Sequence, residues 1–167
     1  MEYISEYVSP AGKILLSSDG ENLTGLWFEN QKYFKDTLDK EYEEKSLPVF
    51  ENVCAWLDRY FKGENPDITF RLKPKGSVFR QRVWRELLNV PYGKTITYGE
   101  IAKKLEKDTG KRASAQAVGG AVGHNPISII IPCHRVVGSN GSLTGYAGGL
   151  GKKKYLLDLE KNHSIHK

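Results

Sequence analysis

A cysteine, a histidine and an arginine stand side by side at Cys133, His134 and Arg135. The thiolate is the reactive form of cysteine, and a neighbouring histidine or cationic group raises its population at neutral pH. A lone free cysteine is more often a small buried hydrophobic residue, so the residue type alone does not indicate catalysis. The histidine and arginine beside it favour the alternative, a nucleophile with its base.

The residues before this triplet predict how it is positioned. Residues 127–131 are mostly isoleucine, and the run is too short and too β-branched for a helix, so it predicts a buried strand. Pro132 lacks the backbone N–H that a strand ladder needs, so the strand should end there. We therefore expect Cys133 at the point where a rigid element stops.

The composition is that of a soluble globular protein, with 39% hydrophobic and 27% charged residues in a chain of 167. No apolar run approaches the roughly 20 residues of a membrane span, and the N-terminus lacks the features of a signal peptide. We therefore expect a cytoplasmic protein whose two cysteines, Cys54 and Cys133, stay reduced.

The net charge of +5 is unevenly distributed along the chain. Residues 1–70 hold 7 Lys or Arg against 14 Asp or Glu, whereas residues 71–167 hold 18 against 6. A basic half of this kind suits a polyanion, although a solvated basic surface is equally consistent with charge alone. The sign changes near the Lys73-Pro-Lys-Gly76 break, which predicts two domains, over residues 1–73 and 74–167.

The first of these segments has the pattern of a small α/β unit. Residues 3–8, 13–18 and 23–28 predict antiparallel strands. Residues 29–46 are polar and predict a loop with a short exposed helix. The apolar spacing of residues 47–61 predicts an amphipathic helix, and residues 69–72 predict one more strand.

The second segment predicts four helices, over residues 78–88, 98–105, 114–123 and 152–161. Ser77 and Thr97 are the expected N-caps of the first two. The second and third helices, joined by a compact loop, have the pattern of a helix-turn-helix.

The apolar spacing also predicts which side chains of these helices are buried. Val78 and Leu88 of the first helix and Tyr155 of the last are expected to face inward, and the lysines at 152–154 to lie in solvent. The tail 162–167 is expected to fray, and its two histidines, His163 and His166, are too isolated for a metal site.

The third of these helices lacks bulky side chains. Alanine and glycine occupy most of it, including Ala117, Gly119 and Gly120, and each helical glycine costs about 1 kcal/mol relative to alanine. Such a helix either packs closely against a neighbour or enters a narrow groove. It offers almost no side chain to read base edges, so it would serve a sequence-specific regulator poorly.

Several separate blocks together resemble the O6-alkylguanine-DNA alkyltransferases, which repair alkylated guanine by accepting the alkyl group themselves. The central block is Ile131-Pro-Cys-His-Arg-Val136. The others follow in the family's order: Tyr92-Gly-Lys94, Thr97-Tyr-Gly99, Ala117-Val-Gly-Gly-Ala121, Asn125-Pro126 and Tyr146-Ala-Gly-Gly149. The resemblance runs from about Gly76 to Glu160 and is loose over the first seventy residues.

The resemblance implies a fold and an activity. The fold would be α/β, with a small RNase H-like N-terminal domain and a mainly helical C-terminal domain that carries a winged helix-turn-helix. The activity would be DNA repair in which Cys133 takes an alkyl group irreversibly, once per molecule, from guanine O6 or, less readily, thymine O4.

The resemblance further implies catalytic roles around Cys133. His134 would accept the thiol proton directly or through a water, and Glu160 would fix the tautomer of His134. Asn125 would be a hinge between the third helix and the active-site strand. The alternatives are an ordinary surface glutamate at Glu160 and simple Asn-Pro turn chemistry at Asn125.

The implied DNA contacts fall on the helix-turn-helix and the loops beside it. The target base must leave the stack at a cost of a few kcal/mol, and Tyr98 would assist its rotation. The implied DNA-binding set is Tyr98, Gln116, Ala117, Gly119, Gly120 and Arg135, and the implied base pocket is Val136, Tyr146, Ala147 and Gly148.

Two positions depart from the family pattern. Gln116 stands where an intercalating arginine is usual, so weaker stacking and slower flipping are expected. Ala147 stands where a serine hydroxyl often contacts guanine O6, so Tyr146 and the nearby backbone N–H groups would do more.

The implied partner is double-stranded DNA containing O6-alkylguanine, bound through its minor groove by a monomer, with no cofactor and no metal. Three alternatives stay open on the sequence. A binding-only lesion sensor would lack Cys133, a transcription regulator would use the same helices, and a generic Cys/His hydrolase would leave the basic half without a role.

Overall fold

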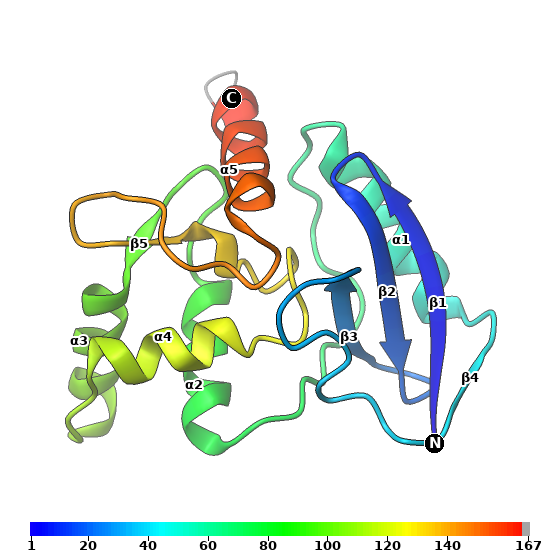
Figure 1. The fold of residues 1–167 in the computed structure, drawn as a ribbon, viewed down its shortest axis with the longest axis horizontal. Coiled ribbons are helices and arrows are strands. Elements are labelled where there is room, and N and C mark those ends of the chain that lie inside the picture. Colours follow the sequence, from blue (N-terminus) through cyan, green and yellow to red (C-terminus); the bar gives the residue numbers. More distant parts are fainter. Residues whose placement is uncertain (165–167) are drawn as a thin grey trace.

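The computed structural model describes residues 1–164, and the chain begins with a four-stranded sheet. β1 (Glu2–Ser9) pairs antiparallel with β2 (Gly12–Ser18), which pairs antiparallel with β3 (Leu23–Phe28). β4 (Tyr42–Glu44) runs parallel to β1, so the strand order is β3-β2-β1-β4. α1 (Pro48–Phe61) covers one face of this sheet (Figure 1).

The sheet and α1 share an apolar core. The strands contribute Ile14 and Leu16, and α1 contributes Val53, Leu57 and Tyr60, each at most 1% exposed. Removing this apolar surface from water is the main force that holds the helix on the sheet. The packing also fixes Tyr60, whose hydroxyl points out of this core toward the C-terminal part of the chain.

The C-terminal part is mainly helical (Figure 1). α2 (Val78–Leu88), α3 (Tyr98–Thr109) and α4 (Ala115–Gly123) pack on one another, and α3 and α4 form the predicted helix-turn-helix. A short 3-10 turn, η1 (Cys133–Arg135), leads into β6 (Val136–Val137), which pairs parallel with β5 (Ile96–Thr97). α5 (Leu150–Ser164) is the last helix. The predicted α/β class and the four helices are therefore confirmed.

The helix caps explain where these helices start. The Ser77 hydroxyl accepts the backbone N–H of Arg80, and Ser114 does the same for Ala117. Thr97 and Glu100 form a reciprocal capping box at the start of α3. Each cap satisfies a backbone donor that the first helical turn leaves free, which stabilises the helix by about 1 kcal/mol.

The strand predicted over residues 127–131 is wrong. The segment turns instead, with only an isolated bridge between Leu26 and Ile127, and Ile129 has a left-handed φ of 68° that no ladder accepts. Asn125 holds the turn through its side chain. The isoleucines are still buried. The apolar pattern of residues 127–131 therefore predicted their burial correctly and their backbone conformation incorrectly.

Two further predictions in the N-terminal part are wrong. Residues 29–46 contain turns and β4 but no helix, and left-handed φ values at Asn30, Tyr33 and Lys35 prevent a helix from forming there. Residues 69–72 form only an isolated bridge between Leu72 and Leu23 rather than a strand.

Several side chains of the helices face the opposite way from the prediction. Val78, Leu88 and Tyr155 are 71%, 40% and 39% exposed, because they lie at helix ends or on the outer face. Lys153 is fully buried rather than solvated. α5 also continues to Ser164, so the predicted fraying from residue 162 is wrong, and His166 lies outside the described residues.

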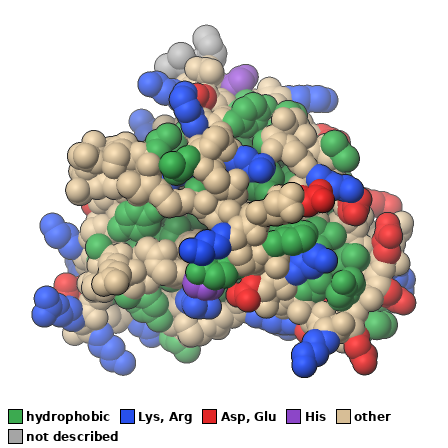
Figure 2. Space-filling view, viewed as in Figure 1, with side chains coloured by type: hydrophobic (Ala, Val, Ile, Leu, Met, Phe, Trp, Pro, Cys, Tyr) green, Lys and Arg blue, Asp and Glu red, His purple; other side chains and the backbone are tan. Residues whose placement is uncertain are grey.

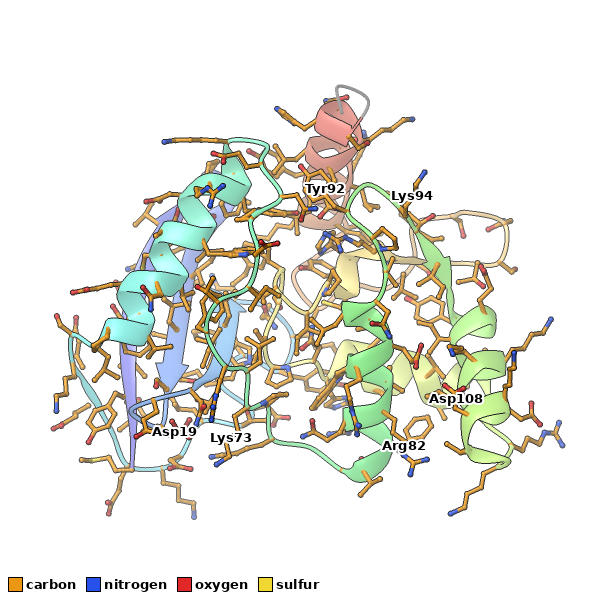
Figure 3. The ribbon with its side chains drawn as sticks, turned by 180° about the vertical axis from the view of Figure 1, so that it is seen from behind. Asp19, Lys73, Arg82, Tyr92, Lys94 and Asp108 are labelled. Atoms are coloured by element: carbon orange, nitrogen blue, oxygen red, sulfur yellow. The ribbon has the colours of Figure 1, made fainter. Side chains whose placement is uncertain are left out.

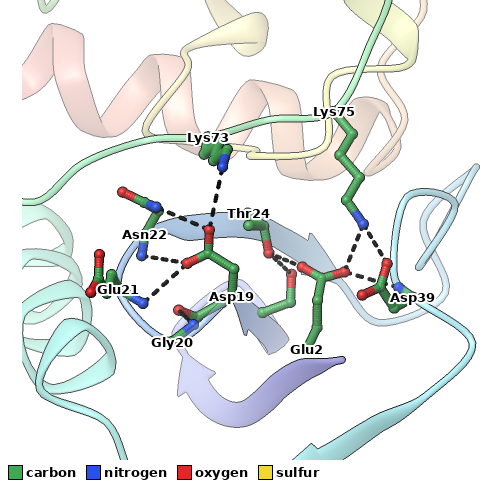
Figure 4. Close-up of polar contacts among 11 residues, drawn as sticks. Glu2, Asp19, Gly20, Glu21, Asn22, Thr24, Asp39, Lys73 and Lys75 are labelled. Atoms are coloured by element: carbon green, nitrogen blue, oxygen red, sulfur yellow. Dashed lines mark hydrogen bonds and ion pairs between the residues drawn. The ribbon is translucent and has the colours of Figure 1, made fainter.

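The segment between α1 and α2 is tied to the sheet by ion pairs. Lys75 Nζ lies 3.2 Å from Glu2 Oε1 and 2.6 Å from Asp39 Oδ1 (Figure 4), and Glu2 is almost fully buried. Lys73 Nζ approaches Asp19 Oδ2 at 3.8 Å, a pair that Figure 3 shows from behind. These contacts fix the direction in which the chain leaves the sheet toward α2.

Candidate active site

Cys133 is the first residue of η1 and is 4% exposed. Pro132 precedes it with φ −80° and ψ 66°, the conformation of an inverse γ-turn, and the backbone N–H of Cys133 donates to the Ile131 carbonyl at 2.7 Å. The thiol is therefore fixed by a tight turn rather than by the end of a strand. A rigid turn serves the same purpose, because it fixes the backbone from which the Cys133 side chain projects.

Asn125 holds that turn. Its side-chain amide donates to the carbonyls of Ile127 at 3.2 Å and Ile131 at 2.8 Å, and its carbonyl oxygen accepts the N–H of Ile127 at 3.0 Å. Asn125 follows the C-cap of α4 directly, so one buried side chain connects the end of α4 to the residues before Cys133.

We expect Asn125→Ala to destabilise the protein by about 3 kcal/mol, because three buried backbone groups would lose their partner. Urea unfolding followed by tryptophan fluorescence measures this. Asn162→Ala, an exposed position on α5, is the matched control and should change stability by less than about 0.5 kcal/mol. Equal stability of the two variants would contradict the proposed role of Asn125 in the turn.

The surroundings of Cys133 act on its pKa in opposite directions. Burial raises the pKa of the Cys133 thiol, while Asn125, Lys153 and Tyr146 act to lower it, and burial prevails. The thiol is therefore protonated at neutral pH and needs a base to react. The neighbours are polar, so the sulfur is not sealed in hydrocarbon.

His134 is fully buried and lies against a carboxylate. Its Nε2 is 2.6 Å from Glu160 Oε2. Burial lowers the pKa of His134, and although Glu160 opposes this, Arg135 and Lys153 add to the lowering, so the imidazole is neutral at pH 7. A neutral ring that donates from Nε2 to Glu160 has its lone pair on Nδ1. Nδ1 is buried and makes no hydrogen bond among the described residues, so it is free to accept a proton.

Glu160 is the centre of a buried polar cluster. Arg135 donates to it from Nε at 2.8 Å and from Nη2 at 3.1 Å, the Tyr60 hydroxyl donates at 2.6 Å, and the Gly93 N–H donates at 3.1 Å. Burial alone would raise the pKa of Glu160, but His134 and Arg135 hold it well below its usual range. Glu160 is thus ionised, which fixes the tautomer of His134.

Arg135 does not lie as expected of a DNA contact. Its side chain is 11% exposed, its guanidinium is paired with Glu160, and Nη1 donates to the Val90 carbonyl at 2.7 Å. These bonds occupy the guanidinium inside the protein, so Arg135 belongs to the buried polar cluster around Glu160. Tyr92, labelled in Figure 3, lies beside it with its ring centre 5.7 Å from the guanidinium carbon.

The sequence did not reveal two members of this site. Lys153 Nζ donates to the carbonyls of Val136 at 2.5 Å and Thr144 at 2.8 Å, and it interacts electrostatically with Cys133. Lys153 and Glu160 are seven residues apart on α5 and therefore share a face of this helix. This spacing is the feature of the sequence that could have indicated Lys153 as a member of the site. Tyr60 comes from α1, and nothing in the sequence connects it to Glu160.

A cleft of about 430 Å³ opens beside this cluster, within the usual range of small-ligand sites. It brings together five of the predicted site residues, which are Tyr98, Gly119, Gly120, Tyr146 and Ala147. The Tyr146 hydroxyl is buried and has no hydrogen bond of standard geometry among the described residues. Burial raises the pKa of Tyr146, and the nearby Cys133 thiol raises it further. Tyr146 therefore connects the cleft with Cys133.

The other predicted pocket residues support the cleft from behind. Val136 is fully buried, and its carbonyl anchors Lys153. A Cβ added to Gly148 would lie 2.7 Å from the Tyr146 ring and 3.2 Å from that of Phe28, so only glycine leaves room for Tyr146. Neither residue lines the cleft itself.

The surface of α4 is exposed and smooth. Gln116 and Ala117 are exposed on its first turn. A Cβ at Gly119 would meet only the Tyr98 ring, at 3.8 Å, and one at Gly120 or Gly123 would meet nothing within 4 Å. Close packing therefore does not explain these glycines, and the remaining explanation is a ligand that approaches the helix closely.

The charges are arranged to suit such a ligand. Acidic side chains gather over the N-terminal sheet, on the right of Figure 2, while Lys and Arg predominate over α2 to α4 on the left. In residues 1–164 no group of His, Cys, Asp and Glu could hold a metal ion, and no helix is long and apolar enough to cross a membrane.

Comparison with known proteins identifies the family. The chain matches the model of the 6-O-methylguanine DNA methyltransferase ribonuclease-like domain over residues 3–74 and the DNA binding domain of the same proteins over residues 78–162. It is 45% identical to the methylated-DNA--protein-cysteine methyltransferase of Haemophilus influenzae, over 99% of this chain and 89% of that protein. The Methanosarcina acetivorans protein of the same name is 43% identical, over 95% of this chain and 97% of that one.

Solved structures agree with this match. Mycobacterium tuberculosis OGT in complex with DNA superposes with a TM-score of 0.84 at 41% identity, covering 96% of this chain and 94% of that one. The O6-methylguanine methyltransferase structure from the same organism gives 0.84 at 39% identity with all of both chains covered. The chain therefore belongs to the 6-O-methylguanine DNA methyltransferase family.

Proposed function

We propose that the protein repairs DNA by moving an alkyl group from guanine O6, and less readily from thymine O4, onto Sγ of Cys133. The observation that carries the proposal is the buried series Cys133, His134 and Glu160 beside a cleft that opens next to a smooth, exposed α4. Membership of the family supports the same reaction.

The proposed reaction begins with the thiol. Nδ1 of neutral His134 accepts the Cys133 proton, directly or through a water, and Glu160 stabilises the imidazolium that forms. Lys153 favours the thiolate electrostatically. Sγ then bonds to the alkyl carbon, the bond from that carbon to O6 breaks, and its electron pair stays with the guanine, which takes up a proton.

Tyr146 is the proposed donor toward guanine O6. Tyr146 lines the cleft, and its buried hydroxyl has no standard hydrogen bond among the described residues. Ala147 brings no hydroxyl of its own, so Tyr146 and nearby backbone N–H groups would make the contact to O6. The product is a thioether on Cys133, which nothing in the proposed site removes, so each molecule acts once and needs no cofactor.

The proposed DNA surface is the face of α4 with Tyr98 at its side. A monomer would place α4 in the minor groove, with Gln116, Ala117, Gly119 and Gly120 against the duplex, and Tyr98 would assist rotation of the target nucleotide. We propose that the domain boundary lies between residues 73 and 74. The first domain, residues 1–73, supports the site from behind, and the second, residues 74–167, carries the nucleophile and the DNA surface.

Gln116→Arg is expected to speed repair of an O6-methylguanine duplex by about threefold to tenfold, because a charged, stacking side chain would stabilise the emptied site. The rate with free O6-benzylguanine should stay within about twofold, because no duplex is involved. Rapid-mixing kinetics with both substrates measures this. An equal change for both would show that residue 116 does not act through the duplex.

Titration of a lesion duplex with the protein tests the proposed function itself. Repair should stop when one lesion has been removed for each protein molecule, and fresh lesion DNA should not restart it. Continued turnover would point to a hydrolase, and DNA binding with no loss of the lesion would point to a binding-only sensor.

A further inference from the structure

A loop of the N-terminal domain reaches the cleft of the C-terminal domain. The chain after β3 runs toward the end of α4 (Figure 1), and Lys32 and Tyr33 from this loop line the cleft together with Tyr98, Tyr146 and Ala147. The family resemblance of the sequence is loose over this part of the chain and implies no role for these residues.

Three consecutive residues of the loop hold three different parts of the site. Gln31 is buried, and its Oε1 accepts the Ser128 hydroxyl at 3.3 Å. The backbone N–H of Lys32 donates to the Ala147 carbonyl at 2.8 Å. The Tyr33 ring stacks on His124 with the ring centres 3.8 Å apart and the planes 24° apart.

These contacts lie around the nucleophile. Asn125 and Tyr146 are side chains that interact with Cys133. His124 precedes Asn125 in the chain, Ala147 follows Tyr146, and Ser128 interacts with the Tyr146 hydroxyl. The loop therefore borders the end of the cleft nearest to the sulfur. In the proposed reaction the alkyl group must lie at this end, because the carbon that it donates has to meet Sγ.

The backbone of the loop is strained. Asn30, Tyr33 and Lys35 have left-handed φ values of 67°, 61° and 62°, which side-chain-bearing residues adopt rarely and at some cost. Such strain persists where the surroundings hold it, and it clusters at functional sites. Here the three contacts of Gln31, Lys32 and Tyr33 hold it, so the loop is a rigid boundary rather than a mobile cover.

We propose that Gln31, Lys32 and Tyr33 form a fixed wall at the sulfur end of the cleft, and that Tyr33, held by His124, limits the size of the alkyl group that Cys133 accepts. The proposal rests on the proposed function. It assigns a specificity role to the N-terminal domain, which otherwise only supports the site.

The test compares a small and a bulky lesion in the same DNA. O6-methylguanine and O6-benzylguanine are placed in identical single-stranded oligonucleotides, which removes the cost of base flipping, and the second-order rate constants for alkylation of Cys133 are measured. In Tyr33→Ala the benzyl-to-methyl ratio of rate constants should rise about tenfold, since added space in an apolar pocket changes selectivity by this order. Tyr33→Phe keeps the ring and should keep the wild-type ratio.

The benzyl-to-methyl ratio distinguishes a role of Tyr33 in limiting alkyl size from a purely structural role, because loss of folded protein lowers both rate constants alike. Tyr42→Ala, an exposed tyrosine of the same domain away from the cleft, is the control and should keep the ratio. If Tyr33→Ala does not fold, His124→Ala removes the other ring of the stack and should raise the ratio in the same direction. An unchanged ratio in folded Tyr33→Ala, or in His124→Ala where Tyr33→Ala does not fold, overturns the proposal, whereas wild-type protein that neither lesion alkylates overturns the proposed function instead.

Discussion

Replacing Cys133 with alanine is expected to abolish alkyl transfer completely while leaving DNA binding within about twofold of wild type. The sulfur of Cys133 is the only proposed acceptor, and Cys133 is 4% exposed, whereas the proposed DNA surface is the exposed face of α4. Removing a buried thiol changes the site by a small volume, so the fold should persist at a cost of about 1 kcal/mol.

Cys54→Ala is the matched control. Cys54 is the other cysteine of the chain and lies half-buried on α1, in contact with the core and not with the cleft. This variant should transfer the alkyl group at the wild-type rate. Repair activity remaining in Cys133→Ala, measured as loss of O6-methylguanine from the oligonucleotide, would contradict the assignment of the nucleophile.

Glu160→Ala is expected to destabilise the protein by about 3–5 kcal/mol, the usual effect of removing one partner of a buried ion pair. The change would leave the partly buried guanidinium of Arg135 unpaired and the Tyr60 hydroxyl and His134 Nε2 without their acceptor. Urea unfolding measures the loss. Asp158→Ala, an exposed ion-paired acid on the same helix, should cost less than about 1 kcal/mol.

The pH dependence of stability should also report on the Glu160 carboxylate. The pKa of Glu160 is depressed in the folded protein. The stability that ionised Glu160 gives the folded state is therefore complete above its unfolded pKa of about 4.3, and it is lost as the pH falls toward the pKa of the folded state. The stability difference between wild type and Glu160→Gln should therefore be constant from pH 8 to about pH 5 and shrink below it. A difference that does not depend on pH would show that Glu160 is not held ionised.

The sequence predicted helices better than backbone turns. The helices starting after Ser77 and Thr97 were predictable because short side chains cap their first turns. The isoleucines before Cys133 predicted a strand, because burial and β-branching look alike in a strand and in a buried turn. The side-chain hydrogen bonds of Asn125, which a local pattern does not reveal, decide the conformation.

The candidate site was predictable only in part. The residues Cys133 and His134 are adjacent in sequence, and Glu160 could be placed beside them only through the family resemblance. Tyr60 and Tyr33 reach the site from the N-terminal domain, a hundred or so residues away from the segments that they contact. Contacts of that kind depend on how the two halves pack, which no local spacing encodes. The buried Lys153 was missed because three consecutive lysines are usually solvated.

The most direct test is mass spectrometry of the protein after incubation with an oligonucleotide containing O6-methylguanine. Peptide mapping should find one added methyl group per molecule, on the peptide that contains Cys133 and not on the one that contains Cys54, while the DNA returns to unmodified guanine. Unmodified protein beside DNA that still carries the lesion, or a methyl group on any other residue, would contradict the account.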